Sequence, residues 1–422
     1  MLVIKNGHIV DPFTSTEDDL DISINDGKIV KVGKDLSAGE DDEVIDATGC
    51  VVAPGLMDAH VHFRDPGFTH KEDIETGAKA AIKGGFTTVV LMANTKPAVD
   101  DPETLKYVLD KGAKTGIHVL SCATVTKGMA GKELVDMELL KAAGAVGFTD
   151  DGLPIMDEYV LRNAFAKAHE IDMPVSLHEE DPAYIVSPGV NQGKVSEQLN
   201  YGGASHQAED VMVKRDCQVA LETKARVCIQ HISSAMSVDI VREYKKKGAD
   251  IHAEATPHHF SLTEDAVLKY GTMARMNPPV RTEADRQAII EGLADGTIDM
   301  IVTDHAPHTR EEKNVPMEKA PSGIIGLETS LGLGIKNLVK PGHLSMMQLM
   351  EKMSKNQAEF YGFKPWPIEE GGVADLVIFN PDQTRKVESF ASKSDNSPFI
   401  GWELPGVVKY TICGGTIVYR NA

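Results

Sequence analysis

Two histidines separated by one residue give the strongest chemical signal in the sequence. His60 and His62 follow an apolar run at 51–57 and open the motif HVHFRDPG. Alternate residues of an extended strand point to the same side, so both imidazoles can reach one metal ion. Arg64 continues this alternation, and its planar guanidinium could hold a carboxylate beside the metal through two parallel hydrogen bonds. A histidine pair alone also fits a half-exposed polar face of a strand. The other potential ligands in the sequence must therefore decide between a metal site and such a face.

The middle of the chain contains the elements that must position these residues. Short apolar runs alternate there with helix-length segments, such as 161–170, in which apolar residues recur at helical spacing. The runs occupy 51–63, 86–93, 117–125, 145–149, 173–178, 227–232, 251–255 and 299–303. Eight such runs predict a (β/α)8 barrel of the TIM type, whose active site is built at the carboxyl ends of the strands. The irregular stretch 305–323 predicts a mobile loop after the eighth strand.

The two ends of the chain follow a different pattern. Residues 1–50 alternate apolar and polar positions between Asn-Gly and Asp-Gly steps, which predicts short antiparallel strands joined by hairpins. The same pattern returns at 374–379 and 407–419. We therefore expect an α/β protein with two domains. Residues 1–53 and 363–422 would form a small β-sandwich, and residues 54–362 would form the barrel.

Charge and cysteine content restrict the function classes. The 422 residues carry a formal net charge of -20 and a pI near 5.2, which argues against nucleic acid or an anionic membrane as partner. No apolar run is long enough to cross a membrane, and the first residues, MLVIKNG, lack the basic and apolar blocks of a secretion signal. Five scattered cysteines without C-x-x-C spacing fit reduced thiols. We expect a cytoplasmic protein that attracts an anionic substrate through a local basic cluster.

Potential metal ligands stand at five of the predicted strand ends. They are His60 and His62 at the first, Asp150 and Asp151 at the fourth, His178 at the fifth, His231 at the sixth and Asp304 at the eighth. A single catalytic zinc normally uses three protein ligands. With one of the two fourth-strand aspartates, the set has six ligands, which suit two metals that share a bridging carboxylate and a bridging water.

The ligand types also suggest how two ions would be divided. His60, His62 and Asp304 would hold one ion, His178 and His231 the other, and an aspartate of the fourth strand would bridge them. Two cations would lower the pKa of the bridging water enough to give hydroxide near neutral pH. Histidine and carboxylate ligands suit Zn first, and Mn and Co also fit such a site.

Three motifs together resemble the microbial monofunctional dihydroorotases of the amidohydrolase superfamily. These are HVHFRDPG at 60–67, GFTDDG at 147–152 and TDHAPH at 303–308, and the likeness covers nearly the whole chain. The resemblance implies that the first-strand histidines bind the more buried zinc ion and the histidines of the fifth and sixth strands bind the second. Many relatives bridge the metals with a carboxylated lysine, but 145–152 contains none. The resemblance gives this role to Asp151, with Asp150 as the competing choice.

The resemblance also implies an activity and a set of substrate contacts. Dihydroorotases reversibly hydrolyse dihydroorotate to N-carbamoyl-aspartate in pyrimidine biosynthesis. A metal-bound hydroxide would attack the ring carbonyl, and Asp304 would act as general base and then as general acid. The substrate contacts implied by motif positions are His62, Arg64, Asn94, Asn277, His308, Ser322 and Gly323. A turn or helix cap would also explain Asn94 and Asn277, and His308 alone could be a solvated loop residue.

Two rival functions follow from the same motifs. Hydantoinases, dihydropyrimidinases and allantoinases share the barrel and the metal pair, but their substrates lack the ring carboxylate that Arg64 and Asn94 would bind. A catalytically silent scaffold would be expected to lose ligands, and all six are present.

The expected partner is a small-molecule substrate. A homodimer and an association with aspartate carbamoyltransferase are open, and no metal ligand is expected from the seventh strand.

Overall fold

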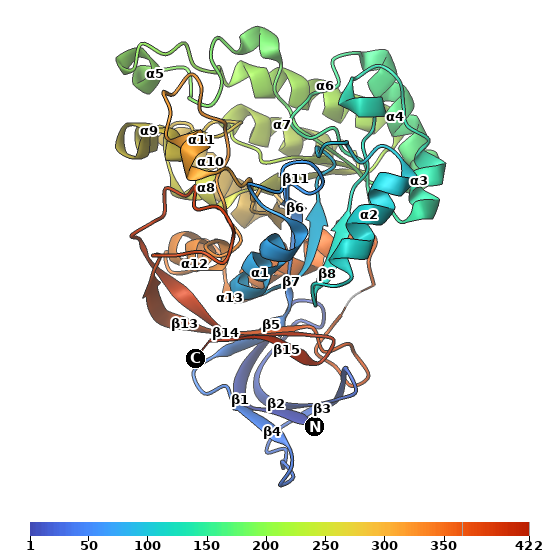
Figure 1. Ribbon diagram of the computed structural model, residues 1–422, viewed down its shortest axis with the longest axis vertical. Helices are drawn as coiled ribbons and strands as arrows, with labels where there is room; N and C mark the ends of the chain where they lie inside the picture. The colour runs from blue at the N-terminus through green and yellow to red at the C-terminus, as the bar shows by residue number, and fades with distance from the viewer. Residues whose placement is uncertain (365, 422) are drawn as a thin grey trace.

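A computed structural model describes residues 1–364 and 366–421 (Figure 1). Strands and helices alternate through the larger part, and a β-sheet that contains both the N- and C-terminal strands lies below it in this view. No helix in the described part of the chain is long and apolar enough to cross a membrane.

Seven short parallel strands surround the core of the larger part. They are β6 (Leu56–Val61), β7 (Phe86–Leu91), β8 (His118–Ser121), β9 (Val175–Leu177), β10 (Val227–Ile229), β11 (Ile251–Ala255) and β12 (Met300–Ile301). Bridges on either side of Phe148 join β8 to β9, so the predicted fourth strand is reduced to these contacts. A bridge between Val61 and His305 then joins β6 to the end of β12. The ring is closed, and the predicted (β/α)8 barrel is confirmed.

Helices follow the barrel strands and cover the outside of the ring. They are α1 (Ile74–Gly84), α2 (Pro102–Gly112), α3 (Met137–Ala143), α4 (Glu158–Glu170), α5 (Lys194–Gln198), α6 (Gln207–Thr223), α7 (Ala235–Lys246), α8 (Pro257–Ser261), α9 (Asp265–Tyr270), α10 (Glu283–Asp295), α11 (Arg310–Lys313), α12 (Ser330–Gly334), α13 (Met346–Met350) and α14 (Asn356–Phe360). The segment predicted to be helical at 161–170 lies within α4. The Asp157 side chain begins this helix by accepting a hydrogen bond from the backbone N–H of Tyr159.

The smaller part is one continuous sheet that folds over its own core. Its strands are β1 (Leu2–Asp11), β2 (Thr16–Asn25), β3 (Lys28–Gly33), β4 (Glu43–Asp46), β5 (Val51–Pro54), β13 (Leu376–Lys386), β14 (Glu403–Cys413) and β15 (Thr416–Arg420). β13 pairs with β5, which joins the two ends of the chain. Ile4 and Ile22 from one end pack in the same apolar cluster as Leu376 and Ile412 from the other. These contacts give the two layers of the expected β-sandwich.

Two local predictions about the N-terminal strands are wrong. The apolar run 51–63 is two strands, because β5 pairs in the end sheet and β6 begins the barrel. The Asn6-Gly7 step is not a hairpin, since it forms a bulge inside β1, with Asn6 at φ 60°. Asp26-Gly27 does connect β2 and β3 as a hairpin. Both dipeptides tolerate positive φ, so sequence alone does not distinguish a bulge from a turn.

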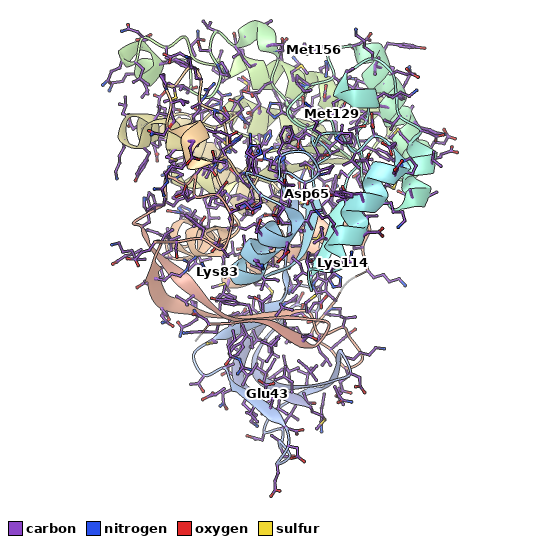
Figure 2. The ribbon with its side chains drawn as sticks, in the orientation of Figure 1. Glu43, Asp65, Lys83, Lys114, Met129 and Met156 are labelled. Carbon is purple, nitrogen blue, oxygen red and sulfur yellow. The ribbon has the colours of Figure 1, made fainter. Side chains whose placement is uncertain are left out.

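The carboxyl ends of the barrel strands face away from the end sheet. Figure 2 shows Asp65, just after β6, farther from the end sheet than Lys83, which stands at the end of α1 next to the sheet. The motif residues that follow the strands therefore lie at the free end of the barrel.

An ion pair connects the opposite end of the barrel to the sheet. His118 begins β8, and its Nε2 lies 2.8 Å from Oδ2 of Asp375, just before β13. The hydrogen bond with Asp375, together with Cys413 nearby, raises the pKa of His118 to about 10. Because the folded-state pKa is raised, the ion pair stabilises the fold fully below about pH 6.5 and loses this effect as pH rises toward 10.

We expect His118→Gln to lower the melting temperature most near pH 6 and hardly at all near pH 10. Half of the His118 side chain is exposed, so solvent screening limits the effect to less than about 1 kcal/mol. Thermal unfolding at several pH values measures the difference. His343→Gln, at an exposed loop position, is the control. A difference that does not change with pH would contradict the prediction.

Candidate active site

The structure brings together the side chains that follow five barrel strands. Ligand atoms of His60, His62 and Asp151 lie within 4.8 Å of one another, and so do those of Asp151, His178 and His231. All five residues are buried. Asp151 belongs to both groups, and this is the position that a carboxylate bridging two metal ions would take.

Asp304 completes the cluster of expected ligands. Its Oδ1 lies 2.9 Å from Nε2 of His62 and 3.5 Å from Nε2 of His60. The backbone of Asp304 has φ 47°, and those of His231 and Arg64 have φ 32° and 58°. Non-glycine residues adopt this left-handed region only when the surrounding structure holds them there. The strand ends are therefore strained where they direct these side chains into the site.

The two adjacent aspartates after the fourth strand point to different places. Asp151 faces the histidines, with its Oδ2 3.4 Å from Nε2 of His62. Asp150 instead accepts hydrogen bonds from the backbone N–H of Val125 at 2.8 Å and of Thr126 at 3.2 Å. Its carboxylate thus holds the loop after β8, and the geometry favours Asp151 as the bridging ligand.

Two further side chains orient the histidines from behind. Nδ1 of His60 lies 2.5 Å from Oε1 of Glu254, and Nε2 of His178 lies 3.0 Å from Oε2 of Glu180. Such partners hold the ring orientation of metal-binding histidines. Sequence reasoning missed Glu254, which lies on β11, and Glu180. Two features of the sequence could have indicated them. Alternate residues of the strand-like run IHAEA point to the same side, and an acidic pair directly follows His178.

Asn94 has an orienting role that the sequence did not indicate. Its Oδ1 lies 2.9 Å from Nδ1 of His62, and its Nδ2 donates to Oδ2 of Asp151 at 3.1 Å. The side chain also lines the cavity described below. Asn94 therefore connects two expected ligands in addition to facing the space for a substrate.

The buried carboxylates dominate the electrostatics of the site. Burial alone would lower the pKa of His60, but Glu254, Asp151 and Asp304 outweigh burial and raise this pKa well above its usual value. At Asp151 and Asp304, burial would raise the pKa, but the neighbouring histidines, His60 foremost, lower it. The carboxylates stay ionised and require compensating positive charge. Divalent cations could replace the protons of the histidines in this role.

The surroundings of one buried nitrogen show whether these residues suit a metal ion. Nε2 of His60 has no hydrogen-bond partner among the residues that the structure describes. It lies 3.6 Å from Asp151 Oδ1 and 3.5 Å from Asp304 Oδ1, too far for good hydrogen bonds. An unpartnered imidazole nitrogen between two carboxylates is suited to an ion that binds all three. The donor set therefore fits a metal centre.

A cavity of about 240 Å³ opens above this cluster. Its lining includes all seven expected substrate contacts, namely His62, Arg64, Asn94, Asn277, His308, Ser322 and Gly323. Met276, Gly152 and Ala306 also line it and were not expected from the sequence. His60 is fully buried beneath the cavity floor.

Arg64 presents a free positive charge to this cavity. Its Nε donates to the carbonyl oxygen of Pro307 at 3.2 Å, and it forms no ion pair within the described ranges 1–364 and 366–421. His308 lies beside it and contacts Lys71 Nζ through Nδ1 at 3.3 Å. Burial, reinforced by Arg64 and Lys71, lowers the pKa of His308. The imidazole is therefore neutral, and the guanidinium remains available for an external anion.

The loop 305–323 is held in place by buried polar contacts. It contains α11, and Nζ of the fully buried Lys313 donates to the carbonyl oxygens of Pro321 at 2.9 Å and Gly323 at 3.1 Å. The Ser322 hydroxyl donates to Oδ1 of Asn277 at 3.1 Å. These contacts place both residues at the cavity wall; the predicted mobility of the loop stays a prediction.

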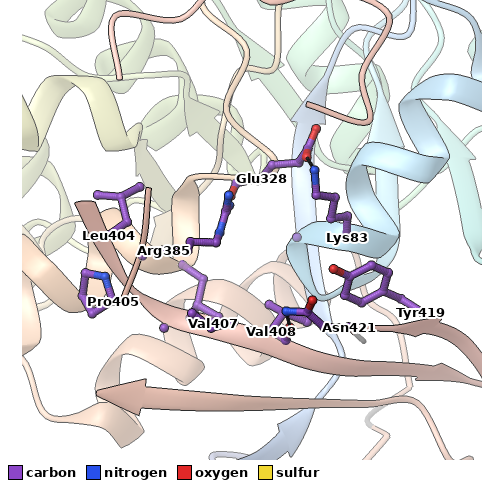
Figure 3. Close-up of a pocket in the computed structure, with 13 residues that line it drawn as sticks. Lys83, Glu328, Arg385, Leu404, Pro405, Val407, Val408, Tyr419 and Asn421 are labelled. Carbon is purple, nitrogen blue, oxygen red and sulfur yellow. Dashed lines mark hydrogen bonds and ion pairs between the residues drawn. The ribbon is translucent and has the colours of Figure 1, made fainter. Parts of the chain in front are cut away.

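A second cavity, of about 130 Å³, lies between the barrel and the end sheet (Figure 3). Its main charged groups compensate one another, because Glu328 Oε2 lies 2.7 Å from Nζ of Lys83 and Arg385 donates to the Glu328 carbonyl oxygen. None of the expected ligands lines it. This cavity is a packing space between the two parts of the molecule.

Comparisons with known proteins agree with the geometry. The amidohydrolase family model matches residues 51–418. Proteins named dihydroorotase from Clostridioides difficile (strain 630) and Clostridium acetobutylicum are 60% and 53% identical, and each match covers 100% of both chains. The solved structure of L-hydantoinase (dihydropyrimidinase) from Arthrobacter aurescens is 26% identical, with a TM-score of 0.89, over 99% of this chain and 96% of that chain. Because full-length identity to the first two exceeds half, this chain belongs to the amidohydrolase family and, within it, to the dihydroorotases.

Proposed function

We propose that the protein interconverts dihydroorotate and N-carbamoyl-aspartate at the cluster below the 240 Å³ cavity. The observation that carries this proposal is Arg64, a cation without an acidic partner in the described part of the chain, beside an intact set of metal ligands. A cyclic amide with a carboxylate substituent matches this pairing of a reacting centre with an anion site. Relatives named dihydroorotase support the assignment.

The cluster would hold two zinc ions, bridged by Asp151. His60, His62 and Asp304 would bind the more buried ion, and His178 and His231 the second. When bound, such ions supply Lewis acidity, which lowers the pKa of water and polarises a carbonyl group. Glu254 and Glu180 would keep two of the histidines oriented for this task.

Asp304 would transfer the proton in the reaction. Its carboxylate is buried, lines the cavity and is kept ionised by His60 and His62. In hydrolysis, Asp304 would take a proton from the attacking water as the new C–O bond forms. It would then give that proton to the ring nitrogen as the C–N bond breaks. In ring closure the same carboxylate would deprotonate the carbamoyl nitrogen.

The far end of the cavity would determine substrate choice. Arg64 would hold the ring carboxylate, with Asn94 and His308 beside it, and Asn277 and the backbone at 322–323 would contact the ring edge. Substrates of hydantoinase type lack this carboxylate and would leave the half-buried guanidinium without an anionic partner, which is costly.

The cysteines bear on the compartment in which the protein works. Five buried, unpaired cysteines support a reducing, cytoplasmic location. A homodimer and an association with aspartate carbamoyltransferase stay predictions from the family resemblance.

Purified protein should hydrolyse dihydroorotate and lose this activity on chelation, with recovery when Zn, Mn or Co is returned. Hydantoin and dihydrouracil should react at least about a hundredfold more slowly, because the contacts to the carboxylate are worth roughly 1.5–3 kcal/mol each. Absorbance assays with all three substrates, before and after chelation, measure this. Fully metal-loaded protein that leaves dihydroorotate unchanged would overturn the proposed function.

The adjacent aspartates offer a matched pair of variants. Asp151→Asn should lower metal content and reduce kcat by at least about a hundredfold, because the bridging charge is lost. Asp150→Asn should keep its metal, since this side chain contacts Val125 and Thr126 instead. Metal analysis of both proteins compares the two outcomes. Loss of metal in Asp150→Asn alone would reverse the assignment.

Arg64→Ala should raise the KM for dihydroorotate by roughly tenfold to a hundredfold while metal content stays unchanged. The estimate follows from the loss of a charged hydrogen-bond donor to a carboxylate, about 1.5–3 kcal/mol. Arg420→Ala is the control, since this exposed arginine pairs with Glu43 in the end sheet. An unchanged KM in Arg64→Ala would remove the carboxylate assignment.

A further inference from the structure

The segment 391–396, between β13 and β14, leaves the end sheet and binds to the barrel. Oε1 of Glu328 accepts hydrogen bonds from the backbone N–H of Ala391 at 2.7 Å and of Ser392 at 3.2 Å. Figure 3 shows Glu328 above β13 and β14, where it also pairs with Lys83. Oε1 of Glu72 accepts from the backbone N–H of Lys393 at 3.1 Å. Two buried carboxylates thus hold this segment against the barrel.

Asn396, at the end of this segment, connects the two ends of the 305–323 loop in the candidate active site. Its side chain is fully buried. Nδ2 donates to the carbonyl oxygens of Ala306 and Gly323, both at 3.0 Å, and Oδ1 accepts from the backbone N–H of His308 at 3.0 Å. The Asn396 carbonyl oxygen accepts from the N–H of Ile325 at 3.1 Å. One residue therefore satisfies four backbone groups on two separate stretches of chain.

The two ends of the 305–323 loop that Asn396 joins form part of the cavity wall. His308 lies at one end and Gly323 at the other, and Asn396 itself does not line the space. The two ends are in close contact, because a Cβ on Gly323 would lie 2.7 Å from the Ala306 carbonyl oxygen and 2.8 Å from Cδ2 of His308. Because Asn396 bonds both ends, a change in its side chain should change the spacing between these parts of the wall.

Only a primary amide matches the groups that face this side chain. Two carbonyl oxygens require a donor, and one N–H requires an acceptor, so an amide satisfies all three. A carboxylate of the same shape would place negative charge against two carbonyl oxygens and lose both donated hydrogen bonds. Buried polar groups left unpaired in this way are expensive, and the two ends of the loop would separate to admit water.

We propose that Asn396 is a positioning residue that sets the spacing between His308 and Gly323, and thereby the affinity for the carboxylate and ring edge of the substrate. The proposal rests on the proposed function. It assigns part of the substrate-binding geometry to the segment that the end sheet contributes. Because these walls contact the substrate away from the bond that is broken, Asn396 acts on binding more than on the chemical step.

The test compares Asn396→Asp with the wild type. We expect the KM for dihydroorotate to rise about tenfold or more, kcat to change less than about threefold, and metal content to stay the same. Asn380→Asp is the matched control, because Oδ1 of this half-buried residue, at an irregularity in β13, accepts from the N–H groups of Asp382 and Gln383 and an aspartate can do the same. If Asn396→Asp does not fold, Asn396→Ala, which adds no charge, replaces it.

A double-mutant cycle with His308→Ala separates positioning from general destabilisation. If Asn396 acts through the His308 loop, the two effects on KM should be clearly less than additive. Additive effects, or an unchanged KM in a folded Asn396 variant, would overturn the proposal. Failure of the wild type to use dihydroorotate would instead remove the proposed function.

Discussion

The concentration of negative charge at the top of the barrel is the constraint on which the rest of the site depends. Asp151, Asp304 and Glu254 are buried within one cluster, and burial of carboxylates is expensive unless positive charge compensates them. The histidines can provide that charge only while protonated. If divalent cations take the place of these protons, they compensate the buried carboxylates and also supply the Lewis acidity of a reaction centre. The strained backbone at Asp304 and His231 shows that the fold maintains this arrangement against local preference.

Much of the architecture could be predicted from the sequence because barrel strands and helices have simple periodicities. The apolar runs were short and regularly spaced, and the ligands followed them directly, so the shared end of the barrel placed them together. The division of 51–63 into β5 and β6 was missed because both halves are buried at every position, so no exposed residue marks the change from one sheet to the other. The period-two signal of a strand does not show which sheet it joins.

The details of the site were less predictable because they depend on contacts that are distant in sequence. Asp150 and Asp151 are chemically identical, and only the backbone N–H groups at 125–126 show why one faces away. Glu254 reaches His60 from a strand on which we expected no ligand. Asn396 gave no local signal at all, since its partners are about 70 to 90 positions earlier in the chain. The metal and substrate roles themselves stay predictions from motif and geometry.

The pairing of β5 with β13 also has a consequence for how the protein is made. About 320 residues separate these two strands, so during synthesis β5 emerges from the ribosome long before its partner. Until then its edge carries unpaired backbone groups, which are a template for incorrect pairing with other chains. The barrel must therefore assemble next to an unfinished sheet, and the nascent chain depends on folding rapidly or on chaperones until its last strands arrive.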